Sequence, residues 1–324
     1  MDMLLLEEDS CIDDLRPFTS TRSVLDIRVG IFTLREKWEM MLGKEAFALV
    51  GSDTPGALPA NILPTRQVIR YPWDIFRYNA EALIADFSLI ASRRTSAPIP
   101  TSVQVINPEK IFIEEGARLQ HCLLNASTGP IYIGRNAEIM EGSLIRGPFA
   151  ACEGSTVKMG TKIYGATTLG PWCTAGGEIK NTVFFGYSSK GHDGYLGDAV
   201  IGEWCNLGAG TSASNLKNNA GDIKVWHPAS GRTISAGQKC GLLMGDYSRS
   251  AINTSFNTGT VVGVCCSVFG EAPPPKYVPN FSWGSRHRYE WDKALRDIDN
   301  WKKLKNQSLT DTEILTLKHI FGVL

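Results

Sequence analysis

Aliphatic residues recur at every sixth position through the middle of the chain, and a small residue follows most of them four positions later. An α-helix would space its apolar residues by three or four, and a half-buried strand would alternate them. A period of six is typical of a parallel β-helix, in which each flat side of the coil turns one aliphatic side chain inward. The aliphatic series is Ile133, Ile139, Ile145, Ala151, Val157, Ile163, Leu169 and Ala175, and the residues four positions after the first seven are Ala137, Ser143, Phe149, Ser155, Thr161, Thr167 and Cys173.

The six-residue phase slips twice along the chain. It resumes at Ile201 and Leu207, and a third series comprises Ile234, Cys240, Asp246, Ile252, Thr258 and Val264. Each slip indicates a loop that leaves the coil, and loops on a rigid scaffold commonly carry functional sites. The second slip coincides with residues 215–232, which are too polar and too rich in glycine and asparagine to continue the coil. An all-β sandwich is the alternative fold, but a sandwich does not hold a fixed phase of six.

The chain divides into three regions. Residues 1–100 lack the six-residue period, residues 101–272 form the predicted coil, and residues 273–324 form a charged helical tail. The expected local features are a helical pattern of Ile31, Leu34, Trp38 and Met41, a loop at 51–56, a second helix with Asp74 as N-cap and Ile75, Leu83 and Leu89 on one face, and tail helices at 291–304 and 311–321 capped by Ser308 or Thr310.

The composition excludes several classes of partner. The 33 Lys and Arg residues balance 33 Asp and Glu residues, so no net field recruits nucleic acid or an anionic membrane. No apolar run approaches the roughly 18 residues of a membrane span, and the start of the chain is acidic where a secretory signal would be basic. Eight cysteines without metal-type spacing indicate a reduced, cytoplasmic protein with no metal site, and we expect surface positions for His121, His227, His287 and His319.

One segment places a histidine and several hydrogen-bonding side chains inside the repeat. It reads Gly-His-Asp-Gly-Tyr-Leu-Gly-Asp-Ala-Val-Ile-Gly over residues 191–202, and Asn-Leu-Gly-Ala-Gly-Thr follows at residues 206–211. From residue 178 to residue 215 the order and spacing resemble the acetyl-transfer half of the bifunctional N-acetylglucosamine-1-phosphate uridyltransferase/glucosamine-1-phosphate acetyltransferase family. Over the rest of the coil only the repeat is shared.

This resemblance implies roles for particular residues. His192 matches the catalytic base, Ala209 matches a backbone contact near the thioester, and the substrate-site residues are Lys180, Tyr195, Asn206 and Asn215. It also implies acetyl-CoA as cosubstrate and a homotrimer whose sites lie between neighbouring coils. The expected fold is therefore mainly β: a left-handed parallel β-helix with a small α/β N-terminal region and C-terminal helices.

These residue types suit acetyl transfer to an amino sugar. Histidine titrates near neutral pH and can take a proton from the amine as it attacks the thioester carbonyl. The tetrahedral oxyanion needs fixed donors, which amides of the 206–211 turn or the Tyr195 hydroxyl would supply. A lysine neutralises a sugar phosphate as a point charge, and asparagine amides pair with sugar hydroxyls.

Most of these residues also have a structural interpretation. Lys180 would be a solvated charge on the outer face of the coil, and Tyr195 a corner residue with its hydroxyl in water. Asn206 and Asn215 would fill tight corners, because asparagine tolerates a left-handed backbone. Asp198 is expected to hydrogen-bond a turn rather than take part in the chemistry.

The sequence departs from the family in its substrate pocket. The family has a phosphate-binding arginine earlier in the coil, and the candidates to replace it here are Lys158, Lys162 and Arg146. The loop after Asn215 differs, and Leu216 stands in place of an aromatic residue. We therefore expect an acceptor other than glucosamine-1-phosphate itself, such as another amino-sugar phosphate or a nucleotide sugar.

The N-terminal region resembles the opening of Bacteroidetes-type sugar nucleotidyltransferases at residues 16–22 and 30–38. It lacks the glycine-rich loop whose amides would approach nucleotide phosphates, and it is too short for a whole nucleotide-binding sheet. Mg²⁺ would be needed only if nucleotidyl transfer survives. We expect a shortened region whose removal leaves acetyl transfer measurable.

Together these features predict an acetyl-CoA-dependent N-acetyltransferase of nucleotide-sugar or cell-envelope precursor synthesis, acting on an amino-sugar phosphate. The alternatives are a sugar-1-phosphate nucleotidyltransferase, uridylyl- or thymidylyltransferase-like, and a non-catalytic β-helix that assembles a partner.

Overall fold

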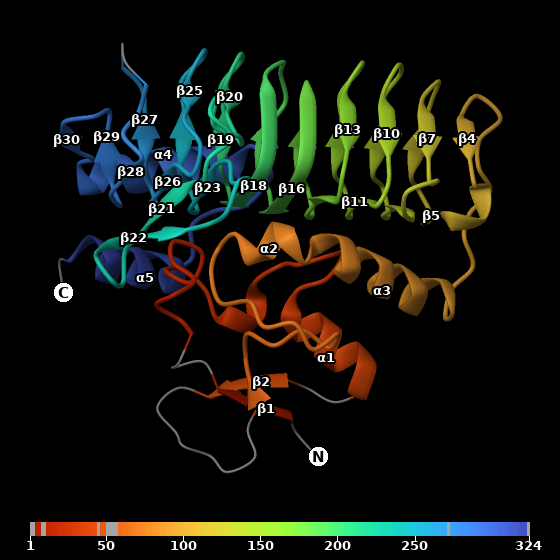
Figure 1. Ribbon diagram of the computed structural model, residues 1–324, viewed down its shortest axis with the longest axis horizontal. Coiled ribbons are helices and arrows are strands. Elements are labelled where there is room, and N and C mark those ends of the chain that lie inside the picture. The colour runs from red at the N-terminus through yellow and green to blue at the C-terminus, as the bar shows by residue number, and fades with distance from the viewer. Residues whose placement is uncertain (1–3, 8–10, 44–45, 50–57, 271–272, 323–324) are drawn as a thin grey trace.

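The body of the molecule is a coil whose turns stack along one axis, so that its strands form three faces (Figure 1). The computed structural model describes residues 4–7, 11–43, 46–49, 58–270 and 273–322, and the loop expected at 51–56 lies outside them. Apart from the last strand, the strands of the coil pair in parallel with those one turn before or after them, as the six-residue period predicts for a parallel β-helix. The structure agrees with the left-handed β-helix class that the resemblance implies.

We number the faces in the order in which the chain meets them. The first face holds β4 (Gln104–Ile106), β7 (Leu123–Asn125), β10 (Leu144–Arg146), β13 (Lys162–Tyr164), the opening halves of β16 (Glu178–Gly186) and β18 (Tyr195–Glu203), β20 (Ser212–Ala213) and β25 (Ser255–Phe256). The second face holds β5 (Ile111–Ile113), β8 (Ile131–Ile133), β11 (Phe149–Ala151), β14 (Thr167–Leu169), the closing halves of β16 and β18, β23 (Leu243–Met244), β26 (Val261–Val262) and β28 (Tyr277–Val278). A 3-10 turn, η2 (Pro108–Lys110), precedes β5.

The third face is built from short strands, one for each turn of the coil. They are β6 (Arg118–Leu119), β9 (Glu138–Ile139), β12 (Thr156–Val157), β15 (Thr174–Ala175), β17 (Ser189–Lys190), β19 (Asn206–Leu207), β24 (Arg249–Ser250), β27 (Ser267–Val268) and β29 (Ser282–Trp283), with β30 (His287–Arg288) antiparallel at the end. Because β28 and β29 continue the ladders, the coil extends past residue 272, where the sequence suggested its end.

The inward column of the coil confirms the first two predicted series. All eight aliphatic positions from Ile133 to Ala175 are at most 1% exposed, and Ile201 and Leu207 are buried as well. The third series is wrong. Ile252 is 68% exposed and Ile234 lies in a hairpin, whereas Met244, Phe256 and Val262 point into the core. Cys240 and Val264 fitted the predicted series although they do not point into the coil. They are buried on its outside, under the flanking regions.

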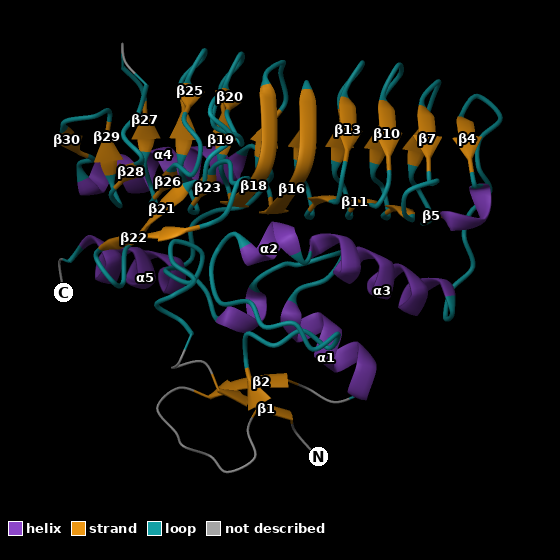
Figure 2. Ribbon diagram, viewed as in Figure 1, coloured by secondary structure: helices purple, strands orange, loops and turns teal. Residues whose placement is uncertain are grey.

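The N-terminal region covers the second face. It contains a small parallel sheet and three α-helices: β1 (Leu4–Glu7), η1 (Val24–Asp26), α1 (Leu34–Leu42), β2 (Ala46–Leu49), β3 (Leu58–Pro59), α2 (Asp74–Arg77) and α3 (Asn79–Ala91). Figure 2 shows these helices along one side of the strand rows. The first helix carries a capping box of Thr33 and Glu36. Asp74 is not an N-cap, because its carboxylate accepts the backbone amides of Arg70 and Tyr71 instead.

The slip after Asn215 is an excursion containing an antiparallel hairpin, β21 (Lys224–His227) and β22 (Arg232–Ser235). Val225 of this hairpin packs with the N-terminal region and the second face. His227 is 3% exposed and its Nε2 lies 3.3 Å from the Asp14 carboxylate, so the surface position expected for it is wrong. The reason is that a long, polar excursion folds back onto the flank of the coil.

Two helices close the chain against the corner between the second and third faces. They are α4 (Trp291–Lys303) and α5 (Asp311–Phe321), as predicted, and Thr310 caps the second in a capping box with Glu313. Aromatic corner residues of the coil, including Trp204, Tyr247 and Phe281, form their contact surface. None of the described helices is long and apolar enough to cross a membrane.

Candidate active site

His192 lies at the corner between the third and first faces, in the loop that joins β17 to β18. Its side chain is exposed. The preceding coil passes directly beneath this loop at Gly177, where a Cβ atom would lie 2.8 Å from the carbonyl oxygen of Gly194. On the other side the Gly210 amide donates to the Asp193 carbonyl, at 3.0 Å. The histidine therefore stands on a loop that is held between two neighbouring coils.

Lys190 is a residue of this loop that the motif comparison did not single out. Its side chain is 1% exposed, and its Nζ donates to the carbonyl oxygens of Gly176, at 3.0 Å, and of His192, at 2.8 Å. Burial lowers the pKa of Lys190 to about 8. The signal in the sequence was a lysine two positions before the histidine, but the phase slip hid that this position points inward.

Tyr195 and Asn215 meet on the first face, above Gly197. A Cβ atom at Gly197 would lie 2.2 Å from the Tyr195 hydroxyl and 3.0 Å from the Asn215 amide nitrogen, so only glycine leaves room for both groups. Burial raises the pKa of Tyr195 to about 12. The Asn215 amide also donates to the buried carboxylate of Asp198, as does the Asn181 amide, at 2.6 Å.

Lys180 lies beside this pair, because it is in register with Gly197. Its Nζ lies 5.7 Å from the centre of the Tyr164 ring on the preceding turn. The Tyr164 hydroxyl donates to Glu178 at 2.6 Å, which raises the pKa of Tyr164 to about 12. Within the described ranges Lys180 makes no salt bridge, so its charge is available to an anionic ligand.

The structure does not bring Asn206 into this group. Asn206 begins β19 on the third face, in register with Ser189 and Arg249, whereas Tyr195 and Asn215 stand on the first face. Ala209 lies on the same corner as His192, one turn further along. The amides of Asn206, Gly208, Gly210 and Thr211 donate to carbonyl oxygens of the coil. The Ala209 amide, which lies outside the strands, has no such acceptor in the described part of the chain, so it is a free donor of this turn.

The first face continues from Lys180 into an open groove of about 430 Å³. Lys162 and Arg146 line it together with Tyr164, and Leu144 forms part of its floor. Lys158 follows β12 on the third face and is not among the lining residues. Of the three candidates for the missing phosphate-binding arginine, Lys162 thus lies one turn and Arg146 two turns before Lys180 on this face.

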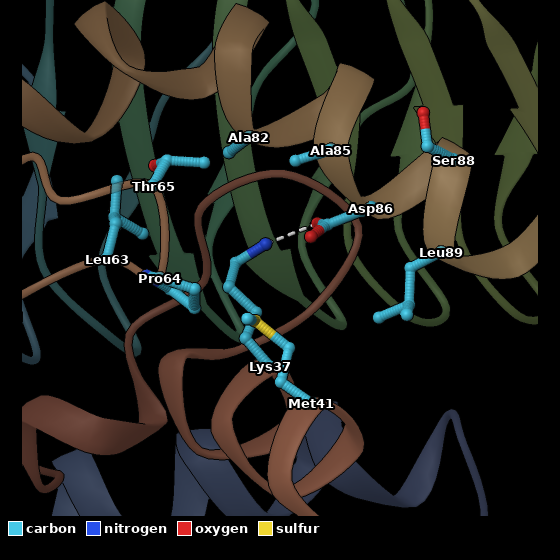
Figure 3. A pocket seen from close by; sticks show the side chains of 10 residues that line it. All are labelled: Lys37, Met41, Leu63, Pro64, Thr65, Ala82, Ala85, Asp86, Ser88 and Leu89. Atoms are coloured by element: carbon cyan, nitrogen blue, oxygen red, sulfur yellow. Dashed lines mark hydrogen bonds and ion pairs between the residues drawn. The ribbon is translucent and has the colours of Figure 1, made fainter.

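A separate cavity of about 400 Å³ lies in the N-terminal region, between α1 and α3 (Figure 3). Lys37 and Asp86 form a buried ion pair on its wall, and Asp86 also accepts the amides of Ile31 and Phe32. The remaining lining is mostly apolar and includes Met41 of α1 and Leu89 of α3 (Figure 3). We interpret the ion pair as the anchor of the loop at Ile31, because it satisfies that loop's backbone.

No group of three side chains suited to hold a metal ion occurs among the residues that the structure describes.

Comparison with known proteins gives matches to a sugar nucleotidyltransferase family and to bifunctional transferases. A family model described as "Sugar nucleotidyl transferase" matches residues 3–53. The Bifunctional protein GlmU of Methanocaldococcus jannaschii is 33% identical over 89 residues, which cover 28% of this chain and 21% of the relative.

Two further relatives give the same picture. The bifunctional sugar-1-phosphate nucleotidylyltransferase/acetyltransferase of Sulfurisphaera tokodaii is 34% identical over 93 residues, which cover 28% of this chain and 23% of the relative. GlmU of Methanococcus maripaludis strain C5 is 28% identical over 195 residues, which cover 60% of this chain and 41% of the relative. The chain thus spans less than half the length of these relatives, and its resemblance to GlmU-type bifunctional transferases is confirmed.

Proposed function

We propose that this GlmU-like chain transfers an acetyl group from acetyl-CoA to the amine of an amino-sugar phosphate. The observation that carries the proposal is the placement of His192. An exposed imidazole stands on a corner loop held between two coils, and three residues further the chain enters the cluster of Tyr195, Asn215 and Lys180. A base, hydrogen-bonding groups and a free cation are thereby gathered on one edge.

In the proposed reaction His192 is the general base. The amine nitrogen attacks the thioester carbonyl carbon, a C–N bond forms, and the imidazole takes the proton that the nitrogen loses. Collapse of the tetrahedral intermediate breaks the C–S bond, and the imidazolium returns the proton to the leaving thiolate of CoA. The products are an amide and a free thiol.

Two donors are placed to stabilise the oxyanion. The free amide of Ala209 lies on the same corner as His192. The Tyr195 hydroxyl stays protonated at neutral pH, because burial raises its pKa to about 12, and it can therefore donate. The Ala209 amide is the better candidate, since it stands on the corner where the thioester is proposed to lie.

The acceptor's phosphate is proposed to bind the cations of the first face. Lys180 supplies a point charge next to Tyr195, and Lys162 and Arg146 extend positive charge along the groove. Asn215 would orient the sugar hydroxyls through its amide. Asn206 would reach such a substrate only from the third face, so we assign it no direct contact.

We further propose a homotrimer in the cytoplasm. The N-terminal region covers the second face and the tail helices cover one corner, which leaves the first and third faces open. We assign the first face to a neighbouring coil. Leu144 is 50% and Ile106 is 45% exposed on that face, as expected of a surface that a neighbour covers. All eight cysteines are buried free thiols, which suits a reducing compartment.

Sugar-1-phosphate nucleotidyl transfer is the second candidate, favoured by the family match over residues 3–53. In the structure, however, the two arginines of residues 16–22 are already engaged in ion pairs. Arg22 is engaged with the buried carboxylate of Asp246 and with Glu203, at 3.0 Å, and Arg16 pairs with Asp13. A purely structural β-helix is the third candidate.

A paired assay separates these candidates. Release of free CoA thiol from acetyl-CoA is measured with a panel of amino-sugar phosphates and nucleotide amino sugars. Release of pyrophosphate is measured in parallel from nucleoside triphosphates with sugar-1-phosphates and Mg²⁺. We expect thiol release with at least one amine and only background pyrophosphate. Pyrophosphate without thiol would replace the proposal with nucleotidyl transfer, and neither product would favour the structural role.

A further inference from the structure

Lys190 occupies a position that most turns of the coil give to an apolar side chain. It is in register with Ala175, and Leu207 follows it in the next strand of the third face, so its side chain stands in the inward column. At 1% exposure it is as buried as its aliphatic neighbours. The small side chain of Ala175 leaves the space through which the lysine reaches the preceding coil.

Stability alone does not account for a lysine at this position. Within the described residues its ammonium group has no carboxylate within salt-bridge distance, and its partners are two carbonyl oxygens. The exposed carboxylate of Asp193 offsets only part of the cost of burying this ammonium, and an apolar residue of similar volume in its place is often neutral or stabilising. Lys302, by comparison, is equally buried but pairs with Glu313 at 2.6 Å.

The two carbonyl groups locate the function of the ammonium. One belongs to Gly176 on the preceding coil and the other to His192 itself. The residues around His192 are glycines and an exposed aspartate, which supply no other buried side chain to fix the loop. A single side chain therefore ties the peptide group of the histidine to the rigid body of the coil.

We propose that Lys190 is a positioning residue: its buried ammonium fixes the backbone of His192 and thereby aims the imidazole at the acceptor amine. This proposal rests on the proposed function, in which His192 is the base. A reacting group that shifts by about 1 Å can lose on the order of 100-fold in rate, so the anchor belongs to the chemistry although it never touches substrate.

The test compares Lys190→Met with Lys302→Met. Methionine fills the inward column without donating to either carbonyl, so Lys190→Met is expected to keep or raise the melting temperature. We expect its kcat to fall about 10- to 100-fold, with both KM values within about threefold, because the substrates do not contact Lys190. The control Lys302→Met removes an equally buried lysine far along the chain, and it is expected to lower the melting temperature with kcat unchanged.

Lys190→Gln adds a conservative variant, since its amide keeps two N–H donors without the charge, and it is expected to recover part of the lost kcat. A kcat for Lys190→Met within twofold of the wild type would overturn the proposal. The proposal would also be overturned if both Lys190 variants lost kcat and melting temperature together and to the same extent as each other, because that result assigns the residue to stability.

Hydrogen exchange makes the test independent of catalysis. The amides of Gly210 and Glu178 donate to the carbonyl oxygens of Asp193 and Gly194 in this loop. They are expected to exchange faster in Lys190→Met than in the wild type, and to stay protected in Lys302→Met. Unchanged exchange in Lys190→Met would refute the anchor. If the wild type releases no thiol, or His192→Ala is fully active, the proposed function fails, and the exchange measurement still decides whether Lys190 holds the loop.

Discussion

Single residues at the corner of the coil decide which groups can meet there. Gly197 is the clearest case, because the Tyr195 hydroxyl and the Asn215 amide both occupy the space of its missing Cβ atom. Lys190 is the opposite case, a long charged side chain where the column would accept a short apolar one. Lys190 precedes His192 by two residues and Gly197 follows it by five, and such local departures from a repeat are expected at functional sites.

Gly197→Ala should reduce activity without unfolding the coil. The added methyl group would displace the end of the Tyr195 side chain and the Asn215 amide, which can rotate away. We expect kcat/KM to fall by about tenfold and the melting temperature to change little. Gly186→Ala is the matched control on the neighbouring strand β16, where a Cβ meets nothing closer than 3.5 Å. Equal activity in the two variants would contradict this account of Gly197.

Lys190 should make stability depend on pH in a defined direction. Burial lowers its pKa from 10.5 to about 8, so between these values the unfolded chain holds a proton that the folded chain has lost. The free energy of unfolding therefore rises with pH through this window, and the cost of the buried ammonium is fully present below pH 8. The change corresponds to roughly 3 kcal/mol.

Urea unfolding of the wild type and Lys190→Met at pH 7 and pH 10 isolates this contribution, because other titrating groups are common to both proteins. The wild type should gain stability relative to the variant as the pH rises. A constant difference between the two proteins would contradict the lowered pKa.

At the level of elements, the sequence predicted the repeat but not everything that surrounds it. A period of six requires only that one aliphatic side chain per side turns inward, so β8 to β15 could be placed from spacing alone. The third series failed because flanking regions bury residues on the outside of the coil, and an outward Cys240 or Val264 then resembles an inward one. Spacing carries no information about such tertiary cover.

The candidate site could also be predicted only in part from the sequence. Lys180, Tyr195 and Asn215 could be chosen from the motif, and they do lie together. Asn206 could not be separated from them, because the motif does not show on which face a residue stands. Lys190 was not predicted as a site residue, because a lysine is expected at the surface. Only the register of β17 with β15 shows that its side chain is buried.

The molecule as a whole is one packed unit rather than a coil with an appended segment. Five side chains on the second face, Val183, Phe185, Val200, Leu243 and Val261, are at most 2% exposed under the N-terminal region. Arg22 crosses the same interface to the carboxylates of Asp246 and Glu203. These contacts lead us to expect that the coil depends on the N-terminal region for its stability, and the truncation below tests this.

Removal of residues 1–95 should destabilise the coil. Each of the five apolar side chains contributes about 1.5–3 kcal/mol when buried, which together approaches the roughly 5–15 kcal/mol of a typical domain. The truncation also leaves Asp246 buried without its arginine. We expect a poorly soluble protein that binds a hydrophobic dye, checked by dye fluorescence and urea unfolding. A soluble truncation with wild-type unfolding would show that the N-terminal region is a separate domain.

The account depends most directly on His192, and one measurement addresses it. Thiol release from acetyl-CoA is followed for the wild type and for His192→Ala with the best amino-sugar acceptor, at matched protein concentration and after the melting temperatures are shown to agree. General-base catalysis predicts that the variant loses a factor of at least about 100 in kcat. A His192→Ala protein that acetylates the acceptor at the wild-type rate would contradict the proposed mechanism.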